Sequence, residues 1–169
     1  MNNLAFVFPG QGSQSVGMIA GLYATHQSIR DTITEASDTL SIDLNKMILE
    51  GPAEVLNRTD NTQPALLAAS VALFRHWQEV SQRMPDVMTG HSLGEYSALV
   101  CAGVLSFADA LKVVQLRGQY MMQAVPAGSS AMAAILGLDD LLVEQACIEA
   151  AGNQVVSPIN YNSPGQLVI

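Results

Sequence analysis

Apolar residues follow two kinds of pattern along this chain, short continuous runs and helical repeats. Residues 4–8 form a continuous apolar run, and residues 86–90 form a second strand-like run of similar length. Such runs are typical of strands that are buried on both faces, as in a parallel sheet. Residues 28–40 instead place apolar side chains three or four positions apart with polar residues between them, which predicts an amphipathic helix.

Three further helices are predicted in the first three quarters of the chain. Thr62 offers a capping hydroxyl and Pro64 suits the first turn, so a helix is expected over residues 62–80. A shorter helix is predicted over residues 95–102, because a glycine follows it at the usual capping position. Another is predicted over residues 106–124, because it opens on capping-box spacing.

The pattern changes after a linker that contains Pro126 and Gly128. A strand, a helix and two further strands, the last after a turn at 163–165, are predicted at residues 131–136, 139–151, 155–161 and 166–169. This order opens a ferredoxin-like unit, which needs a second helix and a fourth strand. Because the sequence stops on an apolar strand inside that unit, we expect Ile169 to be a truncation point and not a natural end.

Composition and charge narrow the class of protein. Hydrophobic residues make up 49% of the 169 residues and charged residues 13%, which excludes a disordered or coiled-coil chain. A formal net charge of −8 without a basic run argues against nucleic acid as a partner. The longest apolar stretch, residues 65–74, is too short to cross a membrane, and the N-terminus does not resemble a signal peptide. We therefore expect a cytoplasmic protein in which Cys101 and Cys147 are small core residues.

Residues Gly90 to Gly94 fit the pattern G-x-S-x-G and lie between a predicted strand and a predicted helix. A tight turn of this kind would present the Ser92 hydroxyl at the edge of the sheet, and the N–H of Leu93 would face a developing oxyanion. Because two glycines and a serine also occur together by chance, an ordinary Gly-Ser turn is the alternative.

A glycine-rich loop at residues 9–14 directly follows the first predicted strand. It has neither a Walker lysine nor G-x-G-x-x-G spacing, which argues against a phosphate cradle. Its glycines would also let the backbone approach a substrate closely, as an oxyanion loop does. The residues alone leave this hypothesis and a plain loop open.

Arg117 continues an apolar helical series formed by Ala110, Val114 and Met121. A guanidinium on such a stripe needs a partner, since an unpaired buried charge is very costly. Spacing alone favours an internal carboxylate as that partner, or a side chain that extends to solvent. The alternative is a clamp for a substrate carboxylate, which suits the planar fork of arginine.

A serine nucleophile ordinarily needs a general base, and histidine is the usual one. His26 and His76 lie in helical, surface-like contexts. His91 adjoins Ser92 on a sharp turn, where neighbouring side chains point in different directions. We therefore expect either that the general base is absent from this sequence or that the chemistry does not use a triad. For His91 we expect a structural or pocket-lining role.

Four motifs together with Arg117 carry a resemblance to a known family. The motifs are residues 8–14, 62–65, 90–95 and 160–166. With them the chain resembles, from its N-terminus to its last residue, the malonyl-CoA:acyl carrier protein transacylases of bacterial type II fatty acid synthesis. The first and third motifs are specific for acyltransferases of fatty acid and polyketide synthesis, and Arg117 indicates the malonyl branch.

The resemblance implies a fold and a domain organisation. The family fold is an α/β-hydrolase-like large domain, a parallel sheet flanked by helices, that carries a ferredoxin-like small subdomain. Residues 1–125 would be the N-terminal part of the large domain and residues 126–169 the first part of the subdomain, so that both are incomplete here. We expect a monomer.

The resemblance also implies a reaction. Ser92 would take the malonyl group from malonyl-CoA as an ester and pass it to the phosphopantetheine thiol of acyl carrier protein, without a cofactor or a metal. The backbone amides of Gln11 and Leu93 would form the oxyanion hole. Arg117 would pair with the malonyl carboxylate. The resemblance thus favours a substrate carboxylate over the internal partner that spacing alone favours. Further pocket-lining residues would be His91, Gln63, Met121 and Asn162.

In this family a histidine from the second half of the chain activates the serine, and this sequence ends before it. Two alternatives therefore stay open. A product of 169 residues could be inactive and only bind a carrier protein or a partner subunit, or the parent could be a serine hydrolase on a similar scaffold. Arg117 and the loop at residues 9–14 favour malonyl transfer over the hydrolase.

Overall fold

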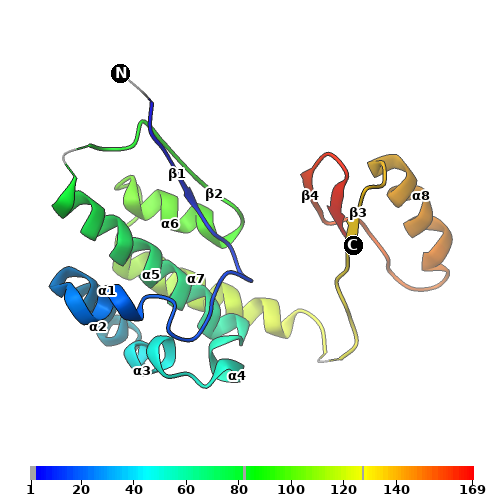
Figure 1. Ribbon diagram of the computed structural model, residues 1–169. Helices are drawn as coiled ribbons and strands as arrows, with labels where there is room; N and C mark the ends of the chain where they lie inside the picture. Colours follow the sequence, from blue (N-terminus) through cyan, green and yellow to red (C-terminus); the bar gives the residue numbers. More distant parts are fainter. Residues whose placement is uncertain (1–2, 82, 127) are drawn as a thin grey trace. The chain divides into compact units, whose positions relative to one another are not determined.

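The computed structural model describes residues 3–81, 83–126 and 128–169. The chain divides into two compact units, Met1–Ala124 and Val125–Ile169, and both contain α-helix and β-sheet (Figure 1). The predicted α/β class is therefore confirmed. None of the helices in the described ranges is long and apolar enough to cross a membrane.

Two parallel strands form the sheet of the first unit. β1 (Ala5–Phe8) pairs with β2 (Val87–Gly90) over its whole length, so that Phe8 lies opposite Gly90. The positions of both strands agree with the predicted runs. The expected burial on both faces is wrong, because alternate residues lie on an open face of the sheet, with Val7 74% and Val87 60% exposed. Because the strands point in the same direction, the loops that follow Phe8 and Gly90 leave the sheet at the same edge, where ligands bind in open α/β sheets.

Four helices of the first unit match predicted helices. They are α2 (Gln27–Leu40), α5 (Thr59–Val80), α6 (Leu93–Cys101) and α7 (Phe107–Gln123). α7 begins as the capping-box spacing predicts, since the Ser106 Oγ accepts a hydrogen bond from the Asp109 N–H at 3.1 Å.

α5 begins at Thr59, three residues before the predicted start at Thr62. The N–H groups of Asn61 and Thr62 both donate to the Arg58 carbonyl oxygen, so the first turn closes before the proline is reached. Pro64 therefore lies inside the helix and not at its first position.

Three short helices between β1 and α5 have no counterpart among the predictions. They are α1 (Ala20–Thr25), α3 (Leu44–Leu49) and α4 (Ala53–Leu56). Each has six residues or fewer, which is less than two helical turns, so an apolar repeat cannot be detected in them.

α5 forms the centre of the first unit and packs against α2, α6 and α7 (Figure 1). Its residues from Thr62 to Ala72 are all buried. A helix that is enclosed in this way is a rigid support for the side chains along it. Gln63 lies in this stretch and is 0% exposed.

In its described residues, the second unit has a three-stranded antiparallel sheet and one helix. Its elements are β3 (Ala134–Leu136), α8 (Asp140–Ala151), β4 (Asn160–Ser163) and β5 (Gln166–Val168). The predicted order of a strand, a helix and two strands is confirmed. The strands lie in the order β3–β5–β4, so the last strand pairs with both of the others.

The predicted position of the second strand in this unit is wrong. The prediction covers residues 155–161, whereas β4 begins only at Asn160. Pro158 precedes this start, and a proline has no N–H to contribute to a ladder. The predicted turn is confirmed, because Gly165 has φ +73° between β4 and β5.

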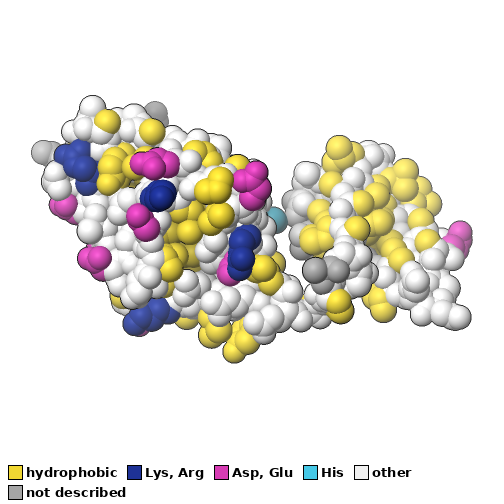
Figure 2. Space-filling model, turned by 90° about the horizontal axis from the view of Figure 1, so that it is seen from below, with side chains coloured by type: hydrophobic (Ala, Val, Ile, Leu, Met, Phe, Trp, Pro, Cys, Tyr) yellow, Lys and Arg dark blue, Asp and Glu magenta, His cyan; other side chains and the backbone are white. Residues whose placement is uncertain are grey.

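The second unit has a small core. Val143 and Cys147 of α8 pack against Leu167 of β5. Large apolar side chains such as Leu141 and Ile148 are exposed, and hydrophobic side chains occupy much of the visible face of this unit (Figure 2).

Candidate active site

Ser92 lies on a sharp turn between β2 and α6. Its backbone has φ +53° and ψ −107°, a conformation that residues other than glycine rarely adopt. α6 begins at Leu93, two residues before the predicted start at Glu95, so the serine directly precedes the helix. Its side chain is exposed and makes no capping bond. The structure thus contains the strained strand–turn–helix that G-x-S-x-G predicts.

Gly90 and Gly94 allow this turn because main chain meets main chain there. A Cβ on Gly90 would overlap the carbonyl group of Gly94, and a Cβ on Gly94 would overlap the carbonyl oxygen of Phe8. The end of β1, the end of β2 and the first turn of α6 are therefore in direct contact. This contact determines where Ser92 lies.

The loop at residues 9–14 lies directly against the same turn. A Cβ on Gly10 would be 2.8 Å from the carbonyl oxygen of His91 and 3.4 Å from its Nδ1. The glycine therefore lets the loop approach the residue that precedes Ser92. This is the approach that an oxyanion loop requires.

Two side chains attach this loop to the region where α5 begins. The Gln11 Nε2 donates to the Thr59 Oγ1 at 3.1 Å, and the Gln14 Nε2 donates to the Asn57 Oδ1 at 2.8 Å. The loop is thus attached to residues near the start of α5 and also lies against His91 at Gly10. The backbone of Gln11 is consequently held between two supports.

The Arg117 guanidinium reaches the serine from α7. Its Nη2 donates to the Ser92 Oγ at 3.0 Å, and its Nη1 donates to the Gln63 Oε1 at 2.6 Å. The centre of the Tyr96 ring lies 5.8 Å from the Arg117 Cζ. None of the ion pairs between described residues includes Arg117, so the internal carboxylate that spacing favours is not its partner.

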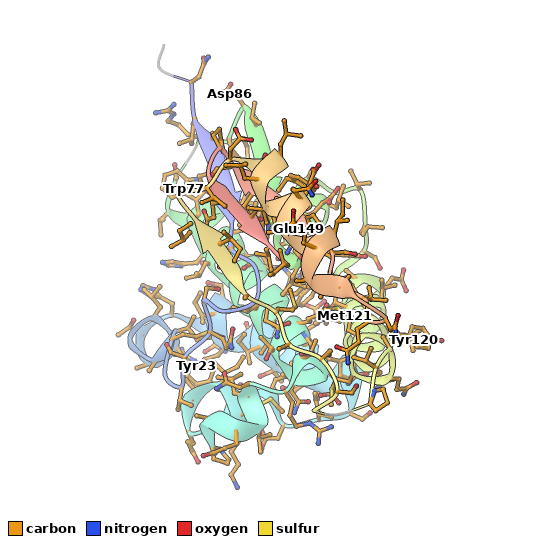
Figure 3. All side chains as sticks on the ribbon, turned by 90° about the vertical axis from the view of Figure 1, so that its right-hand side faces the viewer. Tyr23, Trp77, Asp86, Tyr120, Met121 and Glu149 are labelled. Atoms are coloured by element: carbon orange, nitrogen blue, oxygen red, sulfur yellow. The ribbon has the colours of Figure 1, made fainter. Side chains whose placement is uncertain are left out.

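Gln63 connects Arg117 to Met121. Its Oε1 accepts from the guanidinium, and its Nε2 donates to the Met121 Sδ at 3.3 Å. Because both ends of the amide are used, the orientation of Gln63 is defined. Met121 and its neighbour Tyr120 project from the last turns of α7 (Figure 3), and Met121 is 47% exposed.

The first unit gathers most of the predicted site residues in one region. These are Ser92, Leu93, His91, Gln11, Gln63, Arg117 and Met121. Leu93 is the first residue of α6, where an N–H has no acceptor within the helix. Asn162 lies in β4 of the second unit, and its role stays a prediction.

His26 and His76 do not belong to this region. Their rings lie against each other with centroids 4.0 Å apart and planes tilted by 38°. Both side chains are half-buried, whereas the sequence predicts them on the surface. His76 follows Gln63 by thirteen residues on α5, a separation of about 20 Å along the helix axis. Neither histidine can reach Ser92 as a base.

Burial raises the pKa of the Cys101 thiol, at the end of α6, to about 12. The thiol is therefore neutral at physiological pH, and Cys147 is buried in the second unit. Both cysteines agree with the core role predicted for them. Over the described ranges, no group of three or more His, Cys, Asp or Glu side chains could hold a metal ion.

Sequence reasoning overlooked Tyr96 and Thr59 at this site. Tyr96 follows Ser92 by four residues, so helical spacing would place both on one face if the helix were known to begin at Leu93. Thr59 lies before the predicted start of its helix. In both cases the missing information was the true beginning of a helix.

Comparison with known proteins assigns the chain to a class. The profile of the acyl transferase domain family matches residues 5–169, and the chain belongs to this family. It is 59% identical to the malonyl CoA-acyl carrier protein transacylase of Escherichia coli strain K12, with 100% of this chain and 55% of that relative covered. A protein of the same name from Bacillus subtilis strain 168 is 49% identical, with 100% and 53% covered.

Solved structures agree with this assignment. An acyl carrier protein S-malonyltransferase from Vibrio cholerae superposes with a TM-score of 0.92 at 57% identity, with 99% of this chain and 55% of that chain covered. The chain also matches a solved structure described as a type II PKS acyl-carrier protein in complex with its malonyl-transacylase. The TM-score is 0.94 at 54% identity, with 99% of this chain and 54% of that chain covered. The chain thus spans about half the length of the relatives it matches.

Proposed function

We propose that the complete protein transfers a malonyl group from malonyl-CoA to the phosphopantetheine thiol of acyl carrier protein through an ester on Ser92. This reaction supplies the elongation unit of fatty acid synthesis. The observation that carries the proposal is the Arg117 guanidinium, which contacts the Ser92 hydroxyl at 3.0 Å and has no carboxylate partner among the described residues. A cation beside the nucleophile suits an acyl group that has its own carboxylate, and the names of the relatives support the same reaction.

In the first half-reaction the Ser92 Oγ attacks the thioester carbonyl carbon of malonyl-CoA while a base removes the hydroxyl proton. A carbon–oxygen bond forms, and the N–H groups of Gln11 and Leu93 stabilise the negative charge on the carbonyl oxygen. The carbon–sulfur bond then breaks, coenzyme A leaves as its thiol, and the malonyl ester remains. Arg117 exchanges the Ser92 hydroxyl for the malonyl carboxylate.

The second half-reaction reverses these steps with a different thiol. The phosphopantetheine thiol of acyl carrier protein loses its proton and attacks the ester, and Ser92 leaves and regains its proton. We expect the base to be a histidine outside residues 1–169. His91, Gln63, Met121 and Asn162 would line the pocket.

We further propose that the first unit is part of an α/β-hydrolase-like large domain, residues 1–125. The parallel pair of strands and the strained turn at Ser92 support this assignment. Residues 126–169 would be the first part of a ferredoxin-like subdomain. The central place of β5 between β3 and β4, with α8 packed on the sheet, supports it, since a split βαβ unit inserts a strand in this way.

The reaction brings two anionic substrates to a chain with a net charge of −8. We expect basic residues elsewhere in the complete protein to receive them. We also expect a cytoplasmic monomer without metal or cofactor, because serine acyl transfer needs only a base and oxyanion donors. Neither nucleic acid nor a membrane is an expected partner.

Intact mass spectrometry of the complete gene product after incubation with malonyl-CoA tests the proposal. We expect a gain of one malonyl group on Ser92, its loss when holo acyl carrier protein is added, and no gain in Ser92→Ala. A folded protein without the adduct would contradict the proposal. Loss of the adduct to water at the same rate without carrier protein would instead indicate the serine hydrolase.

A parallel sample of the 169-residue chain tests the role of the remaining sequence. If the base lies outside these residues, we expect at least about a hundred-fold slower acylation, the size of a typical general-base contribution. Acylation at the full rate would show that the described residues suffice and would remove the binding-only alternative.

A further inference from the structure

Tyr96 is the contact of Arg117 that has no task in the proposed reaction. It lies in the first turn of α6, four residues after Ser92, and is half-buried against the main core of the first unit. The centre of its ring is 5.8 Å from the Arg117 Cζ. This is within the range of about 6 Å at which an aromatic ring attracts a cation.

The charge of Arg117 is held in place without being neutralised. Gln63 and Ser92 each accept one hydrogen bond from the guanidinium, and the Tyr96 ring contacts it as well. All three partners are uncharged. The two hydrogen bonds use two of the five N–H donors of an arginine, which leaves three for a substrate carboxylate. A carboxylate in place of the ring would compete with that substrate.

One of these three contacts ends when the serine reacts. In the malonyl ester the Ser92 Oγ is an ester oxygen with less negative charge than a hydroxyl oxygen, so it becomes a poor acceptor for Arg117. The guanidinium then depends on Gln63 and on the Tyr96 ring for its position. Both belong to well-packed helices, α5 and α6, and neither takes part in bond making or breaking.

We propose that Tyr96 is a positioning residue, whose ring holds the Arg117 guanidinium beside Ser92 and thereby sets the preference of the site for acyl groups that carry a carboxylate. This inference rests on the proposed malonyl transfer. Its effect belongs to substrate selection and not to the chemical step, because the ring contacts the cation and not the reacting atoms.

The test compares two substitutions of Tyr96 in the complete gene product. Tyr96→Leu removes the ring and keeps an apolar side chain, whereas Tyr96→Phe keeps the ring and removes only the hydroxyl. The readout is the ratio of kcat/KM for malonyl-CoA to that for acetyl-CoA, which lacks the carboxylate. We expect Tyr96→Leu to lower this ratio about 3- to 30-fold through a higher KM for malonyl-CoA, and Tyr96→Phe to restore it to within about two-fold of the wild type.

Tyr23→Leu is the matched control for lost packing. Tyr23 in α1 is a half-buried tyrosine that packs against the same core, and its hydroxyl donates to the Asn45 Oδ1 at 2.9 Å (Figure 3). We expect it to lower the thermal unfolding midpoint without changing the substrate ratio. The proposal is overturned if Tyr96→Leu behaves like this control, if it slows both substrates equally, or if Tyr96→Phe loses selectivity as much as Tyr96→Leu.

A double-mutant cycle without substrate separates this inference from the proposed function. Urea unfolding of Tyr96→Leu, Arg117→Met and the double variant measures the coupling between the ring and the cation. We expect the double variant to depart from additivity by about two- to five-fold in the unfolding constant. Additive effects would overturn the contact itself, whereas a wild type that forms no malonyl ester would overturn the proposed function and leave this coupling intact.

Discussion

Among the described residues, glycines that close backbone contacts require occur in the first unit alone, whereas glycines that need only a positive φ occur in both units. In the first unit Gly90, Gly94 and Gly118 lie where main chain meets main chain, and a Cβ on any of them would overlap a neighbouring backbone. In the second unit Gly137 and Gly152 have nothing within 4 Å of the place where a Cβ would be, but both have a positive φ. The first set is required by packing and the second by local backbone conformation.

The close backbone contacts of Gly90 and Gly94 lie at the candidate site. Ser92 is placed by backbone contacts among β1, β2 and α6, and such contacts can hold a nucleophile within the roughly 0.5 Å that catalysis requires. The second unit rests on a small core around Leu167 and has no comparable contacts at Gly137 or Gly152. Substitutions at Gly94 and Gly118 should therefore act through space, and those at Gly152 through torsion angles.

The largest effect is expected for Gly94→Ala. The added methyl group would overlap the carbonyl oxygen of Phe8, so α6 must move away from β1 and carry Ser92 with it. We expect a loss of about 3 kcal/mol or more in unfolding free energy and no measurable acylation of Ser92. Thermal unfolding and intact mass after incubation with malonyl-CoA check this. A variant that unfolds at the wild-type temperature and is acylated normally would contradict the packing argument.

Arg117→Met removes the guanidinium beside Ser92 and leaves the backbone contacts of Gly90 and Gly94 unchanged. We expect kcat/KM for malonyl-CoA to fall about a hundred-fold, because two charge-assisted hydrogen bonds to the carboxylate are lost. The unfolding free energy should fall by about 1–3 kcal/mol, since the buried Gln63 Oε1 loses its hydrogen-bond donor. An equal loss for malonyl-CoA and acetyl-CoA would show that Arg117 does not read the carboxylate.

Gly118→Ala tests packing at a distance from the serine. A Cβ there would lie 2.6 Å from the Asp60 Cα, so α7 must separate from the first turn of α5. We expect a loss of about 1–3 kcal/mol in unfolding free energy, together with weaker selection of malonyl-CoA, because Arg117 and Gln63 move apart. Gly21→Ala is the control, since that helical glycine has open space and should gain up to about 1 kcal/mol.

Gly152→Ala should act through torsion alone. Gly152 has φ +51° and ψ −116° at the end of α8, with open space around it. We expect a loss of about 1–2 kcal/mol in unfolding free energy, the same for Gly152→Leu to within about 0.5 kcal/mol, and unchanged acylation of Ser92. At Gly118, by contrast, the leucine variant should lose much more unfolding free energy than the alanine variant. If the loss of unfolding free energy depended equally on side-chain size at Gly152 and at Gly118, the distinction between the two kinds of glycine would be removed.

The same contrast explains what the sequence could predict. The strands at Phe8 and Gly90, the cap at Ser106 and the turn at Ser92 depend on neighbouring residues, so local patterns were sufficient. The spacing of Gly90 and Gly94 in particular indicates the close packing of the turn, because these two glycines contact each other. These features could be predicted without knowledge of the tertiary structure.

Features that depend on distant partners could not be predicted in this way. The position of Arg117 on an apolar stripe indicates that it needs a partner, but only the packing of α7 on α5 shows that the partner is the Gln63 amide and not a carboxylate. The start of β4 likewise depends on its pairing with β5, which the local sequence of residues 155–161 does not determine.

The last effect is absent at neutral pH and concerns Cys101, which packs between the main core of the first unit and the cluster around Phe8. Burial raises the pKa of its thiol from 9.0 to about 12, so the folded protein keeps a proton that the unfolded chain releases. The resulting stabilisation is complete below the unfolded pKa and is lost as the pH rises from about 9 towards about 12.

Urea unfolding of the wild type and of Cys101→Ala over this pH interval measures the effect. We expect the two midpoints to converge as the pH rises, because only the wild type loses this contribution. Parallel curves would show that the thiol is not held neutral by the packing of α6. Since α6 also carries the turn at Ser92, its packing would then be looser than the contacts of Gly94 imply, and the contrast between the two units would be weaker.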